Sequence, residues 1–284
     1  MIWKIFYELC NANKLWILFG LIMSILTYIG TTVTLWVCTN GLISFFRLIA
    51  IQLASTFTNT VIPTGIGSLT LIVRFLKQCG FNTRYATISI AIQQIVQVIV
   101  HIVLLIIFGL LVSKPTNLLK ILLYNKITYS IFLIMFSFLI LLLIVSRLRN
   151  CLFFFIKSFL IESKNQISEL IHNPHRTMLV VLGSAVTIIG SALVLWASIE
   201  AFGGNISIIS VILVSMVSST IGSLSPIPGG IGTTEIVLIE SLNVFNSITI
   251  ISVQSILLYR ILTYWIPMFI GWQAMCWLSK KRLI

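Results

Sequence analysis

The sequence predicts an all-α membrane protein that crosses the bilayer several times. Of its 284 residues, 58% are hydrophobic and 8% are charged, whereas a soluble domain carries about 25% charged residues. Apolar runs follow one another almost end to end, and each helical crossing of a bilayer core about 30 Å thick needs about 20 apolar residues. We therefore expect residues 1–284 to form one integral membrane domain.

Seven apolar runs are expected to form the membrane helices. They cover residues 15–37, 42–62, 86–112, 128–146, 178–202, 206–226 and 247–278. Residues 1–14 resemble a short interfacial helix before the first of them. Residues 229–245 form an eighth, broken crossing if the basic C-terminal end is to lie inside. The predicted number of transmembrane helices is therefore seven or eight.

The polar connection 147–176 fixes the expected orientation. It holds five of the basic residues, so the excess of Lys and Arg in cytoplasmic loops places it inside. Simple crossings then put the N-terminus and residues 74–84 inside as well, with Lys114, Lys120 and Lys126 outside. The expected location is the plasma (inner) membrane of a prokaryote.

Several functional classes are disfavoured by composition. The net charge of +12 comes from residues in the short gaps between apolar runs, which is typical of topology determinants and lipid contacts and not of a nucleic-acid groove. The chain has no Asp, and its five cysteines are far apart, so we expect no metal site, no cofactor and no disulfide frame. We find no catalytic motif and expect a transporter-like protein in preference to an enzyme.

Two interruptions of the apolar pattern have related sequences. Residues 63–67 are P-T-G-I-G and residues 228–232 are P-G-G-I-G, 165 positions apart. A hydroxyl residue and a short apolar helix follow each one, which indicates a duplicated unit with repeat A at about 42–112 and repeat B at about 206–278. One such motif is also typical of a tight turn between helices, but two matched interruptions favour a binding site made by broken or re-entrant helices.

The broken segments supply the predicted substrate-binding residues. Glycine allows close approach, and the N–H groups of a restarting helix favour an anion such as phosphate. The predicted set is Pro63, Gly65, Gly67, Ser68, Arg74, Pro228, Gly229, Gly230, Gly232, Thr233, Glu235 and Arg260.

Three charged residues of this set have alternative roles. Glu235 is in the first turn of the restarting helix, where it caps N–H groups, accepts an ammonium-bearing head group or pairs with Arg260. Arg260 lies deep in its segment, so it faces a cavity, forms a pair or snorkels to an interface. Arg74 is a candidate phosphate clamp or an ordinary cytoplasmic charge.

A polar stripe follows on the segment after the first interruption. Gln93, Gln94, Gln97 and His101 have helical spacing. Such stripes most often join helices by hydrogen bonds, and the alternative is that these residues, with Tyr264, line the translocation path.

These motifs resemble those of a known family. S-P-I-P-G-G-I-G-T-T-E followed by L-L-Y-R-I-L-T-Y-W-I-P-M-F-I-G, and the earlier N-T-V-I-P-T-G-I-G-S-L-T-L-I-V-R-F-L-K-Q-C-G, are similar to the lysylphosphatidylglycerol synthetase transmembrane-region (flippase-like) family. The resemblance covers about residues 15–275 and implies two broken helical units that move lipid head groups. Where that family has Glu-Arg and then Asp, this chain has Gln93, Gln94 and Gln97, and the sequence contains no soluble transferase domain.

The function predicted from the sequence is therefore lipid translocation. Phospholipids or lipid-linked head groups, anionic, aminoacylated or glycosylated, are the expected partners, with a synthase as a possible further partner. Two alternatives stay open: a membrane-embedded transferase, and an accessory or scaffold subunit of a lipid-modifying enzyme that docks through 147–176.

Overall fold

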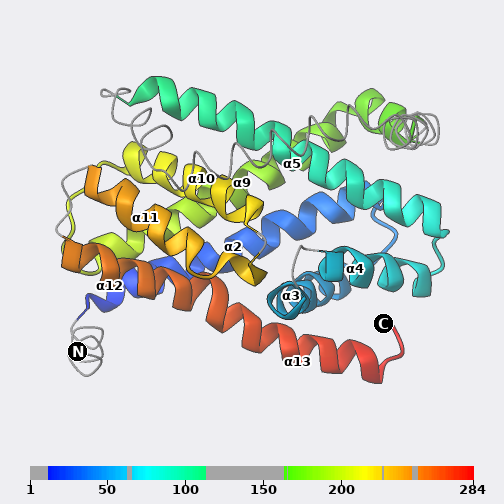
Figure 1. Cartoon of the computed structure of the whole chain (residues 1–284). Coiled ribbons are helices and arrows are strands. Elements are labelled where there is room, and N and C mark those ends of the chain that lie inside the picture. Colours follow the sequence, from blue (N-terminus) through cyan, green and yellow to red (C-terminus); the bar gives the residue numbers. More distant parts are fainter. Residues whose placement is uncertain (1–11, 63–65, 113–162, 165, 226, 245–248) are drawn as a thin grey trace, which may run out of the picture. The chain divides into compact units, whose positions relative to one another are not determined.

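All regular structure in the described part of the chain is helical (Figure 1). The computed structural model describes residues 12–62, 66–112, 163–164, 166–225, 227–244 and 249–284. Its named helices are α2 (Lys14–Cys38), α3 (Phe45–Val61), α4 (Ile66–Gln78), α5 (Thr83–Leu111), α9 (Pro174–Glu200), α10 (Ile208–Leu224), the 3-10 turn η1 (Pro228–Gly230), α11 (Thr233–Val244), α12 (Thr249–Arg260), the π-helical turn η2 (Ile261–Trp265) and α13 (Ile266–Lys280). The predicted all-α class is confirmed over these residues.

Four helical runs in this part are long and apolar enough to cross a membrane. They are Lys14–Cys38, Thr83–Leu111, Pro174–Glu200 and Val253–Lys280. The sequence explains how α2 and α5 begin, because Asn13 accepts from the Leu15 N–H at 3.0 Å and Asn82 accepts from the Arg84 N–H at 3.3 Å, as N-cap residues do. The expected interfacial helix at 1–14 and the expected crossing at 128–146 lie mostly or wholly outside the described residues.

Helices α2 and α9 are antiparallel. The Asn13 N–H donates to the Ala201 carbonyl at 3.0 Å, and further along α2, Gly30 lies against Gly183 and Thr187 so closely that a Cβ would come within 2.6 Å of the Gly183 oxygen. The start of α2 therefore lies beside the end of α9. The simple crossings expected from the sequence would instead have α2 and α9 begin at the same face and run in the same direction.

The helices on either side of the first interruption, α3 and α4, pack against each other as a hairpin. Gly67 faces back toward α3, where a Cβ would lie 2.8 Å from the Ile62 side chain. Cys79, which follows α4, packs against the same core as Leu48 of α3, so the end of α4 lies near the start of α3. The hairpin packs into a core with the C-terminal part of α2, the start of α5 and the end of α13, whose members are Leu35, Ile43, Leu48, Ile51, Ala54, Ile72, Phe75, Leu76, Ala86, Ile90 and Leu278. We call this core 1.

The second interruption also folds back on itself. Helix α10 packs against α11, and a Cβ on Gly222 would lie 2.7 Å from the Thr234 hydroxyl. The buried members of this core, which we call core 2, are Leu195, Ile199, Ile206, Val211, Val214, Leu238, Leu242 and Ile256. Core 2 contains the end of α9 that adjoins Asn13, whereas core 1 contains the opposite end of α2. The two hairpins therefore point toward each other from opposite ends of α2.

Helices α12 and α13 form one run that is interrupted by η2 (orange to red in Figure 1). Pro267 lies in the first turn of α13. In a regular α-helix its ring would clash with the carbonyl four residues earlier, and proline has no N–H to donate to that carbonyl. The wider π turn accommodates this loss, and the Ile266 N–H donates to the Ile261 carbonyl instead. Beyond the turn, α13 packs on α3, and a Cβ on Gly271 would overlap the Leu53 carbonyl oxygen.

Residues 114–177 form a separate compact unit, of which the structure describes 163–164 and 166–177. Arg176 Nη1 lies 3.4 Å from Glu169 Oε1, with 37% and 48% of the side chains exposed. An ion pair this exposed contributes under about 1 kcal/mol. Most of the predicted cytoplasmic loop 147–176 lies outside the described residues.

Candidate functional site

A polar cavity of about 620 Å³ lies where the two hairpins meet. Both interrupted segments line it, together with α5, α12 and η2. Its lining residues are Thr56, Asn59, Thr60, Ser68, Leu69, Gln94, Ser219, Gly222, Ser223, Ser225, Ile227, Gly229, Gly230, Thr234, Tyr259, Arg260 and Tyr264. Segments more than 150 residues apart in sequence thus build one site.

Several lining residues occupy matching places in the two interrupted segments. With the 165-residue offset of the two motifs, Thr60 corresponds to Ser225 and Gln94 to Tyr259, and all four line the cavity. The offset also relates Leu69 to Thr234, again both in the lining. The similarity seen between the motifs therefore coincides with shared positions around one cavity.

The loop after α10 depends on its glycines. Gly229 and Gly230 have φ of +63° and +62°, a region that costs other residues about 1–2 kcal/mol. A Cβ on Gly229 would lie 2.5 Å from Cε2 and 2.7 Å from the hydroxyl of Tyr264. The Thr234 hydroxyl donates to the Gly230 carbonyl at 2.9 Å. The glycines therefore let the backbone approach Tyr264 directly at the wall of the cavity.

Glu235 has two partners, one for each carboxylate oxygen. Oε2 accepts from the Gly232 N–H at 2.7 Å, which is the capping role expected in the first turn of α11. Oε1 lies 2.7 Å from Arg260 Nε, with Arg260 12% and Glu235 26% exposed, although the Nε–H bond is not aligned for a hydrogen bond. The ion pair anticipated as one role of Glu235 is therefore present, together with the cap.

Arg260 has buried N–H donors that the described residues leave without a hydrogen bond. Its guanidinium carbon lies 5.7 Å from the centre of the Tyr264 ring, within the range of a cation–π contact. Its Nη2 is buried and makes no hydrogen bond within the part of the chain that the structure describes. An unpaired buried donor is costly, so an anionic oxygen that reached the guanidinium from the cavity lined by Arg260 would relieve that cost.

The polar stripe of α5 divides between two roles. Gln93 is buried and donates to the Thr31 carbonyl of α2 at 3.2 Å, and His101 Nε2 lies 2.9 Å from the Thr220 hydroxyl of α10. These two residues join helices. Gln94 lines the cavity, and Gln97, which is partly exposed, is not among its lining residues.

The other predicted site residues lie as follows. Ser68, Gly229, Gly230, Arg260 and Tyr264 line the cavity. Gly67, Gly232, Thr233 and Glu235 are beside it in the hairpins but are not among its lining residues. Pro63 and Gly65 lie outside the described residues, and Pro228 begins η1. Arg74 is exposed on α4 and is not in the lining.

Sequence reasoning did not select the hydroxyl and amide groups on the inner ends of the hairpins. Thr56, Asn59 and Thr60 come from α3, and Ser219 and Ser223 from α10. Asn59 and Thr60 are three and four positions after Thr56, and Ser223 is four positions after Ser219, so each group shares one helix face. That spacing, just before each Pro–Gly motif, is a signal from which they could have been found.

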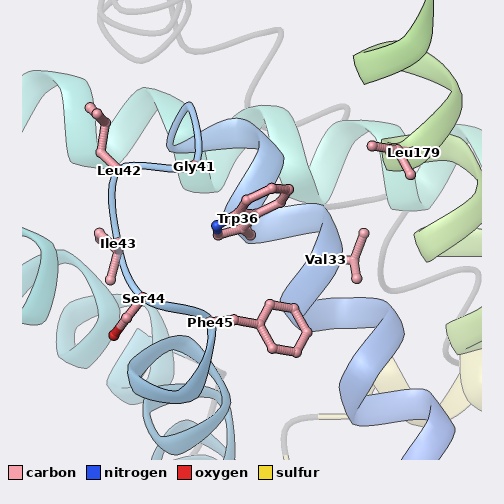
Figure 2. Close-up of a pocket in the computed structure, with 8 residues that line it drawn as sticks. All are labelled: Val33, Trp36, Gly41, Leu42, Ile43, Ser44, Phe45 and Leu179. Carbon is pink, nitrogen blue, oxygen red and sulfur yellow. The ribbon is translucent and has the colours of Figure 1, made fainter.

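A second cavity of about 540 Å³ has a different character. Figure 2 shows Trp36 near its centre, with Leu42, Ile43 and Phe45 around it and Leu179 on α9 opposite. Ser44 supplies a hydroxyl and the other side chains are apolar. None of its lining residues in the described part of the chain is charged or belongs to a Pro–Gly motif, so it is not our candidate site.

Two comparisons bear on this chain. A family model described as "Lysylphosphatidylglycerol synthase TM region" matches residues 4–271. A curated relative, the UPF0104 membrane protein PH1989 of Pyrococcus horikoshii, is 35% identical over 71 residues, which is 25% of this chain and 21% of the relative. The match thus spans about a fifth of that relative's length.

Proposed function

Because the chain belongs to the lysylphosphatidylglycerol synthase TM-region family, we propose that it is a lipid translocase that moves a phospholipid or lipid-linked head group through the cavity between its two hairpins. The observation that carries the proposal is one polar cavity lined by both interrupted segments and by Arg260. The lipid tails stay in the bilayer while the head group passes among the hydroxyl and amide groups. Its partners are membrane lipids, and a synthase could deliver them.

The proposed arrangement in the membrane follows from helix lengths. At about 1.5 Å per residue, α3 and α10 are about 25 Å long and α4 and α11 about 18–20 Å, less than the hydrocarbon core of about 30 Å. We propose that each hairpin enters the membrane from one side and returns to it, and that the four long runs cross fully. The two units are then an inverted repeat, with the cavity near the midplane, as in transporters with broken helices.

The orientation is proposed from charge. Arg74, Lys77 and Arg84 and the C-terminal Lys280–Arg282 flank residues of core 1, so that end faces the cytoplasm by the excess of basic residues there. The start of α2 then faces outward. The membrane is the plasma membrane of a prokaryote.

Reconstitution in liposomes tests the proposal. Fluorescent phospholipids are loaded in both leaflets, and a membrane-impermeant quencher reports how much of the inner pool reaches the outside. We expect quenching beyond the outer-leaflet fraction with the wild-type protein and at least a tenfold slower rate with Arg260→Gln. Arg74→Gln is the matched control, because Arg74 is exposed and outside the lining. No movement above protein-free liposomes would count against translocation and favour the scaffold alternative. Movement at equal rates with all three proteins would count against the role of Arg260 in the path.

A further inference from the structure

The charges around the cavity are already balanced. Arg260 is the charged residue in the described lining, and Glu235 beside it neutralises that charge. Both oxygens of Glu235 are already engaged: Oε2 accepts from the Gly232 N–H at 2.7 Å, and Oε1 lies 2.7 Å from Arg260 Nε in the ion pair. No carboxylate in the described lining is therefore left to receive an added cation.

An ammonium group that entered this cavity would lose its hydration shell and gain few favourable interactions in return. The Tyr264 ring, which could attract a cation, already lies 5.7 Å from the Arg260 guanidinium, so a second cation would be repelled by the first. A buried charge without a partner is strongly disfavoured. A head group that carries an ammonium, such as an aminoacyl ester or ethanolamine, is therefore a poor fit to this cavity.

A neutral polyol is a better fit. Hydroxyl and amide side chains reach the cavity from α3, α4, α5, α10 and α11, and examples are Asn59, Ser68, Gln94, Ser223 and Thr234. The amides of Asn59 and Gln94 can donate and accept. The hydroxyls of Ser223 and Thr234 already donate to the carbonyls of Thr220 and Gly230 and can still accept. This mixture matches the hydroxyl groups of glycerol, inositol or a sugar. Sites that hydrogen-bond substrate hydroxyls discriminate strongly against analogues that lack them.

The guanidinium of Arg260 suits a single monoanionic phosphate next to the polyol. The buried Nη2 of Arg260 has no hydrogen-bond partner among the described residues, and a guanidinium edge suits a phosphate oxygen. We infer that the cavity selects a lipid phosphate esterified to an uncharged polyol, in preference to a head group that carries an ammonium. This inference rests on the proposed translocation and narrows its substrate class.

A comparison of the translocation rates of four head groups in the liposome assay tests the inference. The probes are fluorescent phosphatidylglycerol, phosphatidylinositol, lysyl-phosphatidylglycerol and phosphatidylethanolamine, each in the same neutral carrier lipid. We expect the two polyol lipids to move at least about tenfold faster than the two ammonium lipids, because an unpaired group in a buried site discriminates at least this much. Equal or faster movement of either ammonium lipid would overturn the head-group inference but leave translocation intact.

A second variant pair separates specificity from general damage. Gln94→Leu removes an amide from the lining, whereas Gln273→Leu changes an exposed amide on α13 that does not line this cavity. We expect Gln94→Leu to reduce the polyol preference at least threefold and Gln273→Leu to leave it unchanged. An unaltered preference in Gln94→Leu, with normal protein folding by its melting temperature, would contradict the inference. Failure of every lipid to move overturns the proposed function and the inference together.

Discussion

Replacing Glu235 by Gln is expected to destabilise the protein by removing the counter-charge of Arg260. The two groups are 2.7 Å apart, where Coulomb attraction at an effective dielectric constant of about 20 is about 6 kcal/mol before desolvation is subtracted. Removal of one partner costs about 3–5 kcal/mol for a fully buried pair and under about 1 kcal/mol for an exposed one. With 12% and 26% of the side chains exposed, we expect a loss of about 2–4 kcal/mol.

The choice of Gln isolates the charge. Gln keeps an oxygen that can accept from the Gly232 N–H, because Glu and Gln both serve in this capping position. The free energy of unfolding is measured in detergent micelles by titration with a denaturing detergent, with tryptophan fluorescence as the signal. A double-mutant cycle compares four proteins: wild type, Glu235→Gln, Arg260→Gln and the double variant.

The double-mutant cycle can refute the argument that the Glu235–Arg260 ion pair stabilises the fold. We expect the double variant to be at least about 1 kcal/mol more stable than the sum of the single losses implies, because contacting residues are coupled. Glu240→Gln is the control, since Glu240 is an exposed acid on the same helix. If Glu235→Gln costs no more than Glu240→Gln, or if the single losses add to within about 0.5 kcal/mol, the ion pair does not stabilise the fold as argued.

Three further predictions concern backbone approach and orientation. Gly229→Ala should lower the free energy of unfolding by about 2–4 kcal/mol in the same titration. The φ of +63° disfavours any residue with a Cβ, and that Cβ would overlap the Tyr264 ring. A loss under about 0.5 kcal/mol would contradict this. Gly30→Ala should lower the melting temperature because its Cβ would lie 2.6 Å from a carbonyl oxygen of α9. Gly109→Ala should not, because no atom of the described residues lies within 4 Å of its Cβ position; equal melting temperatures would refute the packing argument. In a cysteine-free background, Lys14→Cys should react with an impermeant maleimide from outside intact cells and Lys281→Cys should not; labelling of both from one side would refute the proposed orientation.

The positions of most described helices could be predicted from the sequence because apolar runs between polar gaps define them. The expected segment 15–37 is α2 at Lys14–Cys38, and 178–202 is α9 at Pro174–Glu200. The interruptions were also predictable, since Pro and Gly cannot continue a helix without loss. The direction of α2 relative to α9 was not, because an apolar run is equally apolar in either direction and Lys14 alone says little about its side.

The site was predictable in part. The glycine motifs and Arg260 could be selected because a broken backbone and a deep cation both demand an explanation in hydrocarbon. Arg74 illustrates the limit, since seven residues of helix after Gly67 carry it about 10 Å from the tip of the hairpin. Distance along a sequence gives no direction in space until the hairpin is known. The hydroxyl groups of α3 and α10 were missed for a related reason, because Ser and Thr are equally common in helix packing.

The position of η2 has a mechanical consequence. Helix α12 contributes Ile256 to core 2, and α13 contributes Leu278 to core 1, so one helical run links the two cores through η2. Long helices kink at proline and at π-helical turns, and this run has both, at Pro267 and at Ile261–Trp265. A change in the angle between α12 and α13 would therefore move Arg260 and Tyr264, which line the cavity.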